Sequence, residues 1–277
     1  MKKINVVLTQ SLIKDELVLK DKNVIIIDVL RASTTMTIAL TNGAKEIIPA
    51  DNVSTAAMIA KGTGNSLLCG ERGGKVVEGF DLGNSPLEYG EEVVKDKVLV
   101  FSTTNGTSSV VKAKYTTNCV IACFVNLSEV VNCVRLLEDD VTLICSGKLN
   151  NFCLEDVICA GVIIEQVNKL QAKDSKYILG DSEFAAIELA KSFVLEKGKP
   201  SAKKIMKMLR NTEHGKYLIS LGLDKDLSVC SKVDSYPFLP LFKDGIIKLT
   251  EKMATENLEK AKMKKINLGN TKESNSN

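Results

Sequence analysis

The most reactive side chains of this sequence directly follow a run of apolar residues. Val24–Ile27 is a β-branched stretch typical of a buried strand, and Asp28 and Arg31 come immediately after it. A carboxylate at this place could bind a metal ion or attack phosphorus, and a guanidinium can hold an oxyanion through two parallel hydrogen bonds. The alternative is an ion pair between the two charged residues, with Ser33 or Thr34 capping the helix that follows.

Two clusters of glycines and charged residues, at 70–74 and 79–86, lie within one connection. Glycine lets backbone N–H groups approach an anion closely. Glu71 and Asp81 could bind a hard cation, and Arg72 could bind a phosphate or a sulfonate. The alternative is an exposed loop in which the glycines form turns. Because long irregular connections often carry function, we favour the first interpretation.

A third polar segment, Ser102–Thr107, follows the apolar run Val98–Phe101. Its hydroxyl and amide groups could form an anion cradle between a strand and a helix, because residues 108–114 have a helical pattern. The Asn105-Gly106 pair is equally typical of a tight turn between antiparallel strands. The sequence leaves the cradle and the hairpin open.

Two adjacent acids and the single histidine lie farther along the chain. Glu155 and Asp156 open a helical stretch and could bind magnesium, although acids in a first helical turn are also stabilised by the helix dipole. His214 lies in a basic stretch typical of an amphipathic helix with a solvated side. The alternative is that His214 acts as a lid residue or a proton carrier.

The elements that must position these groups alternate between strands and helices. Apolar runs predict strands at 4–8, 24–27, 46–48, 67–69, 98–101, 119–122 and 141–145. Helical patterns predict helices at 32–41, 54–61, 108–114 and 127–137. Strands that are apolar on both faces and linked by helices predict a three-layer α/β/α fold with a largely parallel or mixed sheet. Ligands are then expected beyond the carboxyl ends of the strands.

The second half of the chain is richer in helical patterns. They predict helices at 154–170, 183–195, 202–209 and 215–221, with a last strand at 246–249. We divide the chain into an α/β domain at 1–172 that carries most motifs, a helix-rich part at 173–250 that completes the site or the fold, and a flexible polar tail at 251–277.

The composition indicates a globular protein. Of the 277 residues, 44% are hydrophobic and 26% are charged, and no apolar run is long enough to span a membrane. Lys and Arg total 37 against 34 Asp and Glu, and this nearly neutral balance argues against a nucleic-acid partner. The first residues lack the pattern of a secretory signal, which predicts a cytoplasmic protein.

The eight cysteines lie mostly inside apolar runs, so we expect buried thiols in place of disulfides. No pair has the Cys-x-x-Cys spacing of a zinc site. Cys119 and Cys123 have no histidine nearby, and a single histidine cannot form a His-rich metal site. The spacing therefore argues against zinc.

Taken together, the ordered motifs resemble the 2-phosphosulfolactate phosphatase family, the ComB proteins of coenzyme M biosynthesis. The resemblance covers about Asn5 to Gly161 and rests on Asp28–Thr35, Gly70–Gly74, Gly79–Pro86, Thr103–Thr107, Phe124–Asn126 and Glu155–Asp156. It implies a ComB-like α/β fold and a Mg²⁺-dependent acid phosphatase that converts (R)-2-phospho-3-sulfolactate into (R)-3-sulfolactate and phosphate. It also implies a fold unrelated to the haloacid-dehalogenase phosphatases, and Leu30 stands where their Asp-x-Asp-x-Thr loop has its second acid.

This resemblance and the residue types together suggest roles for individual side chains. The expected catalytic residues are Asp28, Arg31 and Asp81. The Mg²⁺ ligands are expected among Asp28, Glu71, Asp81, Glu155 and Asp156. Substrate binding is expected from Arg72, Asn84, Ser85, Thr103, Thr104, Asn105, Gly106, Thr107 and Asn126. Asp28 would be the nucleophile of a phosphoaspartyl route, and metal-activated water is the competing route.

Two other functions stay open at the level of the sequence. The substrate could be another small phosphorylated hydroxy acid, or the loops could form a non-catalytic module that binds a small anion. Several acids and arginines at strand ends exceed what anion binding needs, which favours an enzyme. The expected partner is a small phosphorylated and sulfonated acid, without nucleic acid or membrane, and a homo-oligomer is compatible with the sequence.

Overall fold

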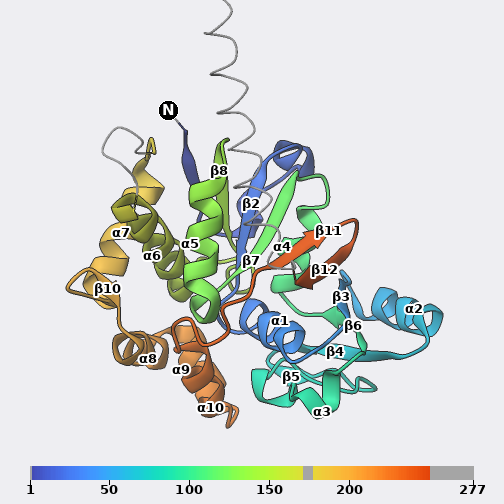
Figure 1. Cartoon of the computed structure of the whole chain (residues 1–277). Coiled ribbons are helices and arrows are strands. Elements are labelled where there is room, and N and C mark those ends of the chain that lie inside the picture. The colour runs from blue at the N-terminus through green and yellow to red at the C-terminus, as the bar shows by residue number, and fades with distance from the viewer. Residues whose placement is uncertain (1, 171–176, 250–277) are drawn as a thin grey trace, which may run out of the picture.

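The computed structural model describes residues 2–170 and 177–249. Within these residues, ten strands form one mixed sheet in the order β1-β8-β2-β7-β11-β12-β3-β6-β4-β5 (Figure 1). The strands are β1 (Ile4–Val7), β2 (Asn23–Ile27), β3 (Glu46–Pro49), β4 (Ser66–Arg72), β5 (Lys75–Val76), β6 (Val98–Ser102), β7 (Asn118–Ala122), β8 (Val141–Cys145), β11 (Pro240–Lys243) and β12 (Ile246–Leu249). A separate small hairpin is formed by β9 (Leu195–Glu196) and β10 (Lys199–Pro200).

The sheet consists of two parallel groups joined by an antiparallel hairpin, with the short strand β5 antiparallel to β4 at one edge. Strands β1, β8, β2 and β7 run parallel to one another, and so do β3, β6 and β4. Strands β11 and β12 lie between the groups and are antiparallel to each other and to their outer neighbours. Figure 1 shows β2, β7 and β8 upright and β4 lying across the lower part of the molecule, as the twist of a large sheet requires.

Helices cover both faces of this sheet. They are α1 (Ala32–Thr41), α2 (Val53–Thr63), α3 (Glu91–Val94), α4 (Gly106–Lys112), α5 (Leu127–Leu136), α6 (Leu154–Leu170), α7 (Asp181–Phe193), α8 (Ala202–Asn211), α9 (Glu213–Ser220) and α10 (Asp224–Cys230). Short 3-10 helices lie at Gln10–Leu12, Glu16–Leu19, Pro86–Glu88 and Phe124–Asn126. The predicted α/β fold with a mixed sheet is confirmed.

Strand β2 shows how the sequence produces the layers. Ile25 and Ile27 belong to the core that contains α5, α6 and α7, whereas Val24 and Ile26 belong to the core that contains α1. Successive side chains of a strand point to opposite faces, so a strand covered on both sides is apolar along its length. All five residues of β2 are buried, and the unbroken apolar run Val24–Ile27 predicts this for four of them.

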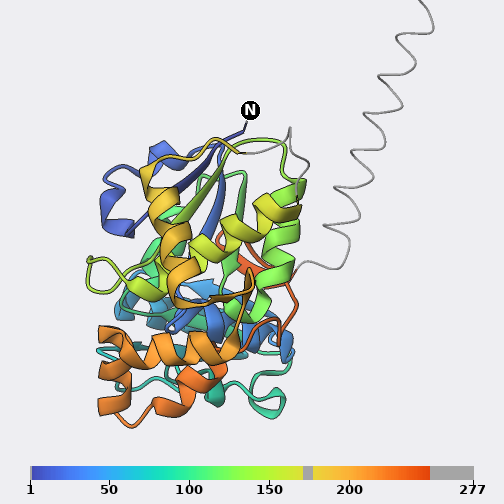
Figure 2. The ribbon, with the colours of Figure 1, turned by 90° about the vertical axis from the view of Figure 1, so that its left-hand side faces the viewer.

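The helix-rich segment 202–230 covers one end of the sheet. In Figure 2 its orange helices lie at the lower end of the molecule, below the yellow helix α7. Ile205, Leu209 and Leu218 join the same core as α6 and α7. This packing brings the first residues of α9 next to the strand ends that carry the polar motifs.

The carboxyl-terminal strands differ from the prediction. The sequence predicts one strand at 246–249, whereas the structure pairs it with a second strand, β11, inside the sheet. This four-residue strand begins with Pro240, and a short run headed by proline gives little strand signal. The predicted tail at 251–277 lies outside the described residues, and the domain division near residue 173 stays a prediction. Within the described residues, no helix combines the length and apolar character needed to cross a membrane.

Candidate active site

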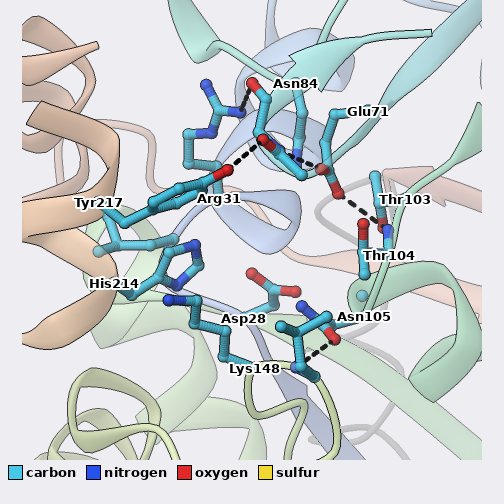
Figure 3. A pocket seen from close by; sticks show the side chains of 15 residues that line it. Asp28, Arg31, Glu71, Asn84, Thr103, Thr104, Asn105, Lys148, His214 and Tyr217 are labelled. Carbon is cyan, nitrogen blue, oxygen red and sulfur yellow. Dashed lines mark hydrogen bonds between the residues drawn. The ribbon is translucent and has the colours of Figure 1, made fainter. Parts of the chain in front are cut away.

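A cavity of about 250 Å³ opens where several strands end. Its walls come from the segments after β2, β6 and β8, from the β4–β5 turn and from α9 (Figure 3). The lining residues are Asp28, Leu30, Arg31, Glu71, Gly73, Gly74, Asn84, Thr103, Thr104, Asn105, Gly106, Lys148, Leu149, His214 and Tyr217. The position agrees with the expectation that ligands bind beyond the carboxyl ends of strands.

Asp28 is the buried carboxylate of this cavity, and only 6% of the residue is exposed. Its Oδ1 accepts a hydrogen bond from the backbone N–H of Ala32 at 3.1 Å, so the carboxylate caps the first turn of α1. The Ser33 hydroxyl instead accepts from the N–H of Asp28 at 3.0 Å, and the predicted cap by Ser33 or Thr34 is wrong. Among the described residues no hydrogen bond reaches Oδ2, which leaves this oxygen for a ligand.

Buried negative charge surrounds Asp28. Burial raises the pKa of Asp28 to about 6, against the opposing charge of His214. The neighbouring carboxylates of Glu71 and Glu155 contribute to this rise. Burial also raises the pKa of Asp156 well above its usual range, and Asp28 and Glu155 add to the effect. A cation bound among these carboxylates would therefore be stabilised strongly.

His214 connects the cavity to Glu155. Its Nδ1 lies 3.1 Å from Glu155 Oε1. Burial by itself would raise the pKa of Glu155, but this hydrogen bond and the charge of His214 lower it overall. The amphipathic helix predicted in this region is α8, which ends at Asn211, and His214 belongs to the next helix. Its ring lines the cavity, where a proton carrier or a lid residue would have to lie.

Arg31 is 3% exposed and is fixed by residues far away in the sequence. Its Nη1 donates to Asp226 Oδ2 at 2.7 Å, and its Nη2 donates to the carbonyl of Gly74 at 3.0 Å. Asp226 also accepts a hydrogen bond from the hydroxyl of Ser85 at 2.6 Å. The ion pair considered between Asp28 and Arg31 is therefore wrong, because Asp226 is the partner of the guanidinium.

Glu71 joins the end of β4 to the loop after β6. Its Oε1 accepts from the N–H of Thr104 at 2.8 Å, and its Oε2 accepts from the backbone of the β4–β5 turn at 2.7 Å. Within the loop, the hydroxyl of Thr107 accepts from the N–H of Thr103 at 2.9 Å. Helix α4 begins at Gly106, so the strand-loop-helix interpretation is confirmed and the hairpin is wrong.

Two residues that line the cavity contain a buried polar atom without a hydrogen-bond partner among the described residues. These atoms are Asn84 Oδ1 and Thr104 Oγ1. A buried polar atom left unpaired costs about 1–3 kcal/mol, so these atoms indicate a polar ligand. Asn105 Oδ1, in contrast, accepts from the N–H of Leu149 at 3.0 Å and ties the loop after β6 to the loop after β8.

The cavity also contains Lys148 and Tyr217, which the sequence does not identify as site residues. Lys148 Nζ lies 4.9 Å from the centre of the Tyr217 ring and 3.0 Å from Glu213 Oε1. The side chain of Glu213 is 92% exposed, so this ion pair is weak and leaves the lysine charge to the cavity. Lys148 follows the predicted strand at 141–145, and this position at the carboxyl end of a strand could have identified it as a site residue. Tyr217 has no such signal, because tertiary packing brings its helix here.

Three acids predicted as metal ligands, Asp81, Glu155 and Asp156, lie outside the cavity lining, and Glu155 borders it only through His214. Asp81 is exposed, and its Oδ2 accepts from the N–H of Leu68 at 2.8 Å. Asp156 is buried, and its two oxygens accept from the N–H groups of Val29 at 2.9 Å and Gly147 at 3.1 Å. Asp156 thus fixes the ends of β2 and β8 relative to each other.

Other predicted substrate-binding residues support the walls. Arg72 donates to the carbonyl and the hydroxyl of Ser102, both at 2.9 Å, and holds β4 against β6. Asn126 accepts from the N–H of Cys123 at 3.0 Å and shapes the turn after β7. Ser85 and Thr107 are buried and bonded as described above. The structure thus brings together Asp28, Arg31, Glu71, Asn84 and the 103–106 loop.

A mixed α/β sheet that places a buried carboxylate, an arginine and a lysine around one cavity is the kind of arrangement found in enzymes that act on small anionic substrates. Phosphoric monoester hydrolases are enzymes of this class. A family model described as 2-phosphosulpholactate phosphatase matches residues 7–245. The chain belongs to this family.

Bacterial relatives are similar over most of their length, and each is named probable 2-phosphosulfolactate phosphatase. The relative from Caldanaerobacter subterraneus is 35% identical over 236 residues, which cover 84% of this chain and 92% of the relative. The relative from Clostridium tetani is 35% identical over 246 residues, 88% of this chain and 99% of its own. The relative from Carboxydothermus hydrogenoformans is 38% identical over 221 residues, 80% and 86% of the two chains.

Proposed function

We propose that this chain is a Mg²⁺-dependent phosphatase that hydrolyses (R)-2-phospho-3-sulfolactate to (R)-3-sulfolactate and phosphate. Membership of the family and the names of the relatives support this substrate. The observation that carries the proposal is Asp28, a buried carboxylate whose Oδ2 is left for a ligand in a cavity that also contains Arg31 and Lys148. A phosphate monoester dianion repels nucleophiles, so hydrolysis requires charge neutralisation next to the attacking group.

Asp28 fits the role of a Mg²⁺ ligand better than the other acids. Glu71 and Asp156 use both oxygens on backbone N–H groups, and Asp81 and Glu155 lie outside the lining. Proteins often hold Mg²⁺ through one or two carboxylates, with phosphate oxygens and water in the other positions. Bound at Asp28, Mg²⁺ would neutralise phosphate charge and polarise the ester.

The charges of the cavity match a substrate with several acidic groups. Phosphosulfolactate carries a phosphate, a sulfonate and a carboxylate on three carbons, and all three groups are ionised near neutral pH. Lys148 supplies positive charge, Arg31 adds a guanidinium whose charge Asp226 partly balances, and His214 adds another charge when it is protonated. The unpartnered atoms of Asn84 and Thr104 can bind a hydroxyl group or water near the ester. Together these groups would orient the ester beside Asp28.

His214 fits the role of the proton carrier. Departure of the lactate oxygen requires a proton, and a positioned histidine is a common donor. The hydrogen bond from Nδ1 to Glu155 orients the ring in the cavity wall. Glu155 thus holds His214 as an acid partner holds a catalytic histidine in other hydrolases.

Two routes use the carboxylate of Asp28. In one, Asp28 attacks phosphorus and a phosphoaspartate forms; in the other, water attacks directly and Asp28 acts through Mg²⁺. Acid quenching during turnover of substrate with a labelled phosphoryl group separates them. Label on the peptide that contains Asp28 supports the first route, and complete release of label from the protein supports the second.

The substrate proposal is tested by phosphate release from phosphosulfolactate and from phospholactate, which lacks the sulfonate. We expect Mg²⁺-dependent turnover, loss of turnover with a chelator, and a higher kcat/KM for the sulfonated ester. Lys148→Met should reduce that preference at least about tenfold, because a charged hydrogen bond contributes about 1.5–3 kcal/mol. Equal turnover of both esters would instead indicate another phosphorylated hydroxy acid. Tight binding without turnover would indicate an anion-binding module.

A further inference from the structure

A second group of metal-ligating side chains lies on the other side of His214. It borders a separate cavity of about 350 Å³, which is lined in part by Cys153, Glu155 and Thr212. The Cys153 Sγ, a carboxylate oxygen of Glu155 and a ring nitrogen of His214 all lie within 4.8 Å of one another. Cys153 and Glu155 are buried, whereas His214 is partly exposed at the cavity wall.

We infer that Cys153, Glu155 and His214 form a binding site for a transition-metal ion of the Zn²⁺ class, separate from the Mg²⁺ position proposed at Asp28. A thiolate and an imidazole prefer Zn²⁺ and Co²⁺, whereas Mg²⁺ prefers oxygen ligands and retains water. Three protein ligands leave the fourth position of a tetrahedral ion to water from the adjacent cavity.

The distances are close to those that a tetrahedral ion requires. Zn–S bonds of about 2.3 Å and Zn–N and Zn–O bonds of about 2.0–2.2 Å place neighbouring ligand atoms roughly 3.3–3.8 Å apart. Glu155 Oε1 and His214 Nδ1 are 3.1 Å apart, and the largest separation in the group is at most 4.8 Å. A pair at the 4.8 Å limit would have to approach by about 1 Å to reach the range of a tetrahedral ion.

The local charge also favours a cation here. Glu155 is 1% exposed, and Asp28 and Asp156 lie near enough for their carboxylates to interact with it electrostatically. His214 is the one titratable cation bonded to Glu155 among the described residues. A divalent ion would compensate more of this buried charge than a single imidazolium does.

Binding changes the protonation of two ligands in a defined way. The S–H bond of Cys153 breaks, the thiolate forms the bond to the metal, and the proton leaves to solvent. The ion also replaces the proton at His214 Nδ1, which an imidazolium loses to solvent and a neutral ring regains at Nε2, so that the imidazole binds as the neutral tautomer protonated at Nε2. In the metal-bound chain the ion thus takes over the orientation of the ring that Glu155 provides in the metal-free chain. Metal uptake therefore releases protons, which calorimetry in buffers of different ionisation enthalpy can count.

The test uses the full chain, stripped of metal and titrated with Co²⁺ in the presence of excess Mg²⁺. We expect about one equivalent of Co²⁺ to bind and to produce the absorption of a thiolate-to-cobalt charge transfer, which a site made of carboxylates cannot give. Cys153→Ser should abolish this absorption and weaken Zn²⁺ binding by more than about 100-fold, beyond the loss typical of outer-shell changes.

Cys133→Ser is the matched control, because Cys133 is 6% exposed and Cys153 is 5% exposed. The control should bind Co²⁺ as the unchanged chain does. Absence of the absorption in the unchanged chain, or its persistence in Cys153→Ser, would overturn the proposal. Should circular dichroism show that Cys153→Ser does not fold, His214→Ala at the partly exposed ligand provides the second test, and undiminished Co²⁺ affinity in that variant would equally contradict the site.

Discussion

Replacing Asp28 with asparagine should stabilise the folded chain at neutral and alkaline pH. The side chain is buried beside Glu71 and Glu155, and burial raises its pKa to about 6 from a usual value of 3.8. Between these two pH values the folded chain binds more protons than the unfolded chain, so the free energy of unfolding falls as the pH rises. Asparagine keeps the acceptor for the N–H of Ala32 and removes the charge.

The magnitude follows from the pKa difference. At about 1.4 kcal/mol for each tenfold change in the proton equilibrium, a pKa of about 6 against 3.8 corresponds to about 3 kcal/mol. This penalty is fully present above pH 6 and absent below about pH 4. Because Asp28 interacts with neighbouring carboxylates, about 3 kcal/mol is an upper bound for the gain in the free energy of unfolding that the single substitution produces.

Urea unfolding at pH 4 and pH 8, without Mg²⁺, measures the effect. Asp28→Asn should be more stable than the unchanged chain at pH 8 by up to about 3 kcal/mol and nearly equal to it at pH 4. Addition of Mg²⁺ at pH 8 should raise the stability of the unchanged chain and not that of the variant, because an ion that binds only the folded state stabilises it.

Asp81→Asn is the control, since it removes an exposed carboxylate of the same type outside the cavity. It should show neither the gain at pH 8 nor a loss of the Mg²⁺ effect. A variant at Asp28 that is no more stable than the unchanged chain at pH 8, or equally stabilised at pH 4, would refute the assignment of buried charge to this residue.

Other substitutions test the positions of the reacting groups. In Gly106→Ala the new Cβ would lie 2.4 Å from Ala32 Cβ and 2.7 Å from Asp28 Oδ2, so we expect kcat to fall by about 10–100-fold with the fold intact. Gly62→Ala, with nothing within 4 Å, should keep full kcat in the same phosphate-release assay, and equal rates for both variants would contradict the close packing at Asp28. Asp226→Asn leaves Arg31 buried without its partner and should reduce the free energy of unfolding by about 3–5 kcal/mol in urea, whereas a loss below about 1 kcal/mol would show that the pair is dispensable.

The sequence predicts the parts of the site that lie next to strands. Apolar runs identify β2 and β6, and the polar residues that follow them, Asp28 and the 103–106 loop, do line the cavity. Local pattern is sufficient here, because the carboxyl end of a strand fixes where the next residues emerge. Lys148 lies after the end of β8, so the same rule would place it at the cavity.

Contacts between distant segments could not be predicted in this way. Asp226 is 195 residues from Arg31 in the sequence, and His214 is 59 residues from Glu155. The spacing rule that argues against zinc examines only nearby cysteines and histidines, so it does not detect a group that includes Cys153 and His214. The insertion of β11 and β12 into the middle of the sheet likewise depends on tertiary packing. The residues of a four-residue strand do not predict which strands will be its neighbours.

The most direct test of the proposed chemistry is the rate of phosphate release from (R)-2-phospho-3-sulfolactate as Mg²⁺ is varied, for the unchanged chain, Asp28→Asn and Asp81→Asn. A buried carboxylate that acts at the reacting phosphate predicts Mg²⁺-dependent turnover in the unchanged chain and in Asp81→Asn, and a loss of at least about 1,000-fold in Asp28→Asn with its fold retained. Turnover by a folded Asp28→Asn within about tenfold of the unchanged rate would contradict the account.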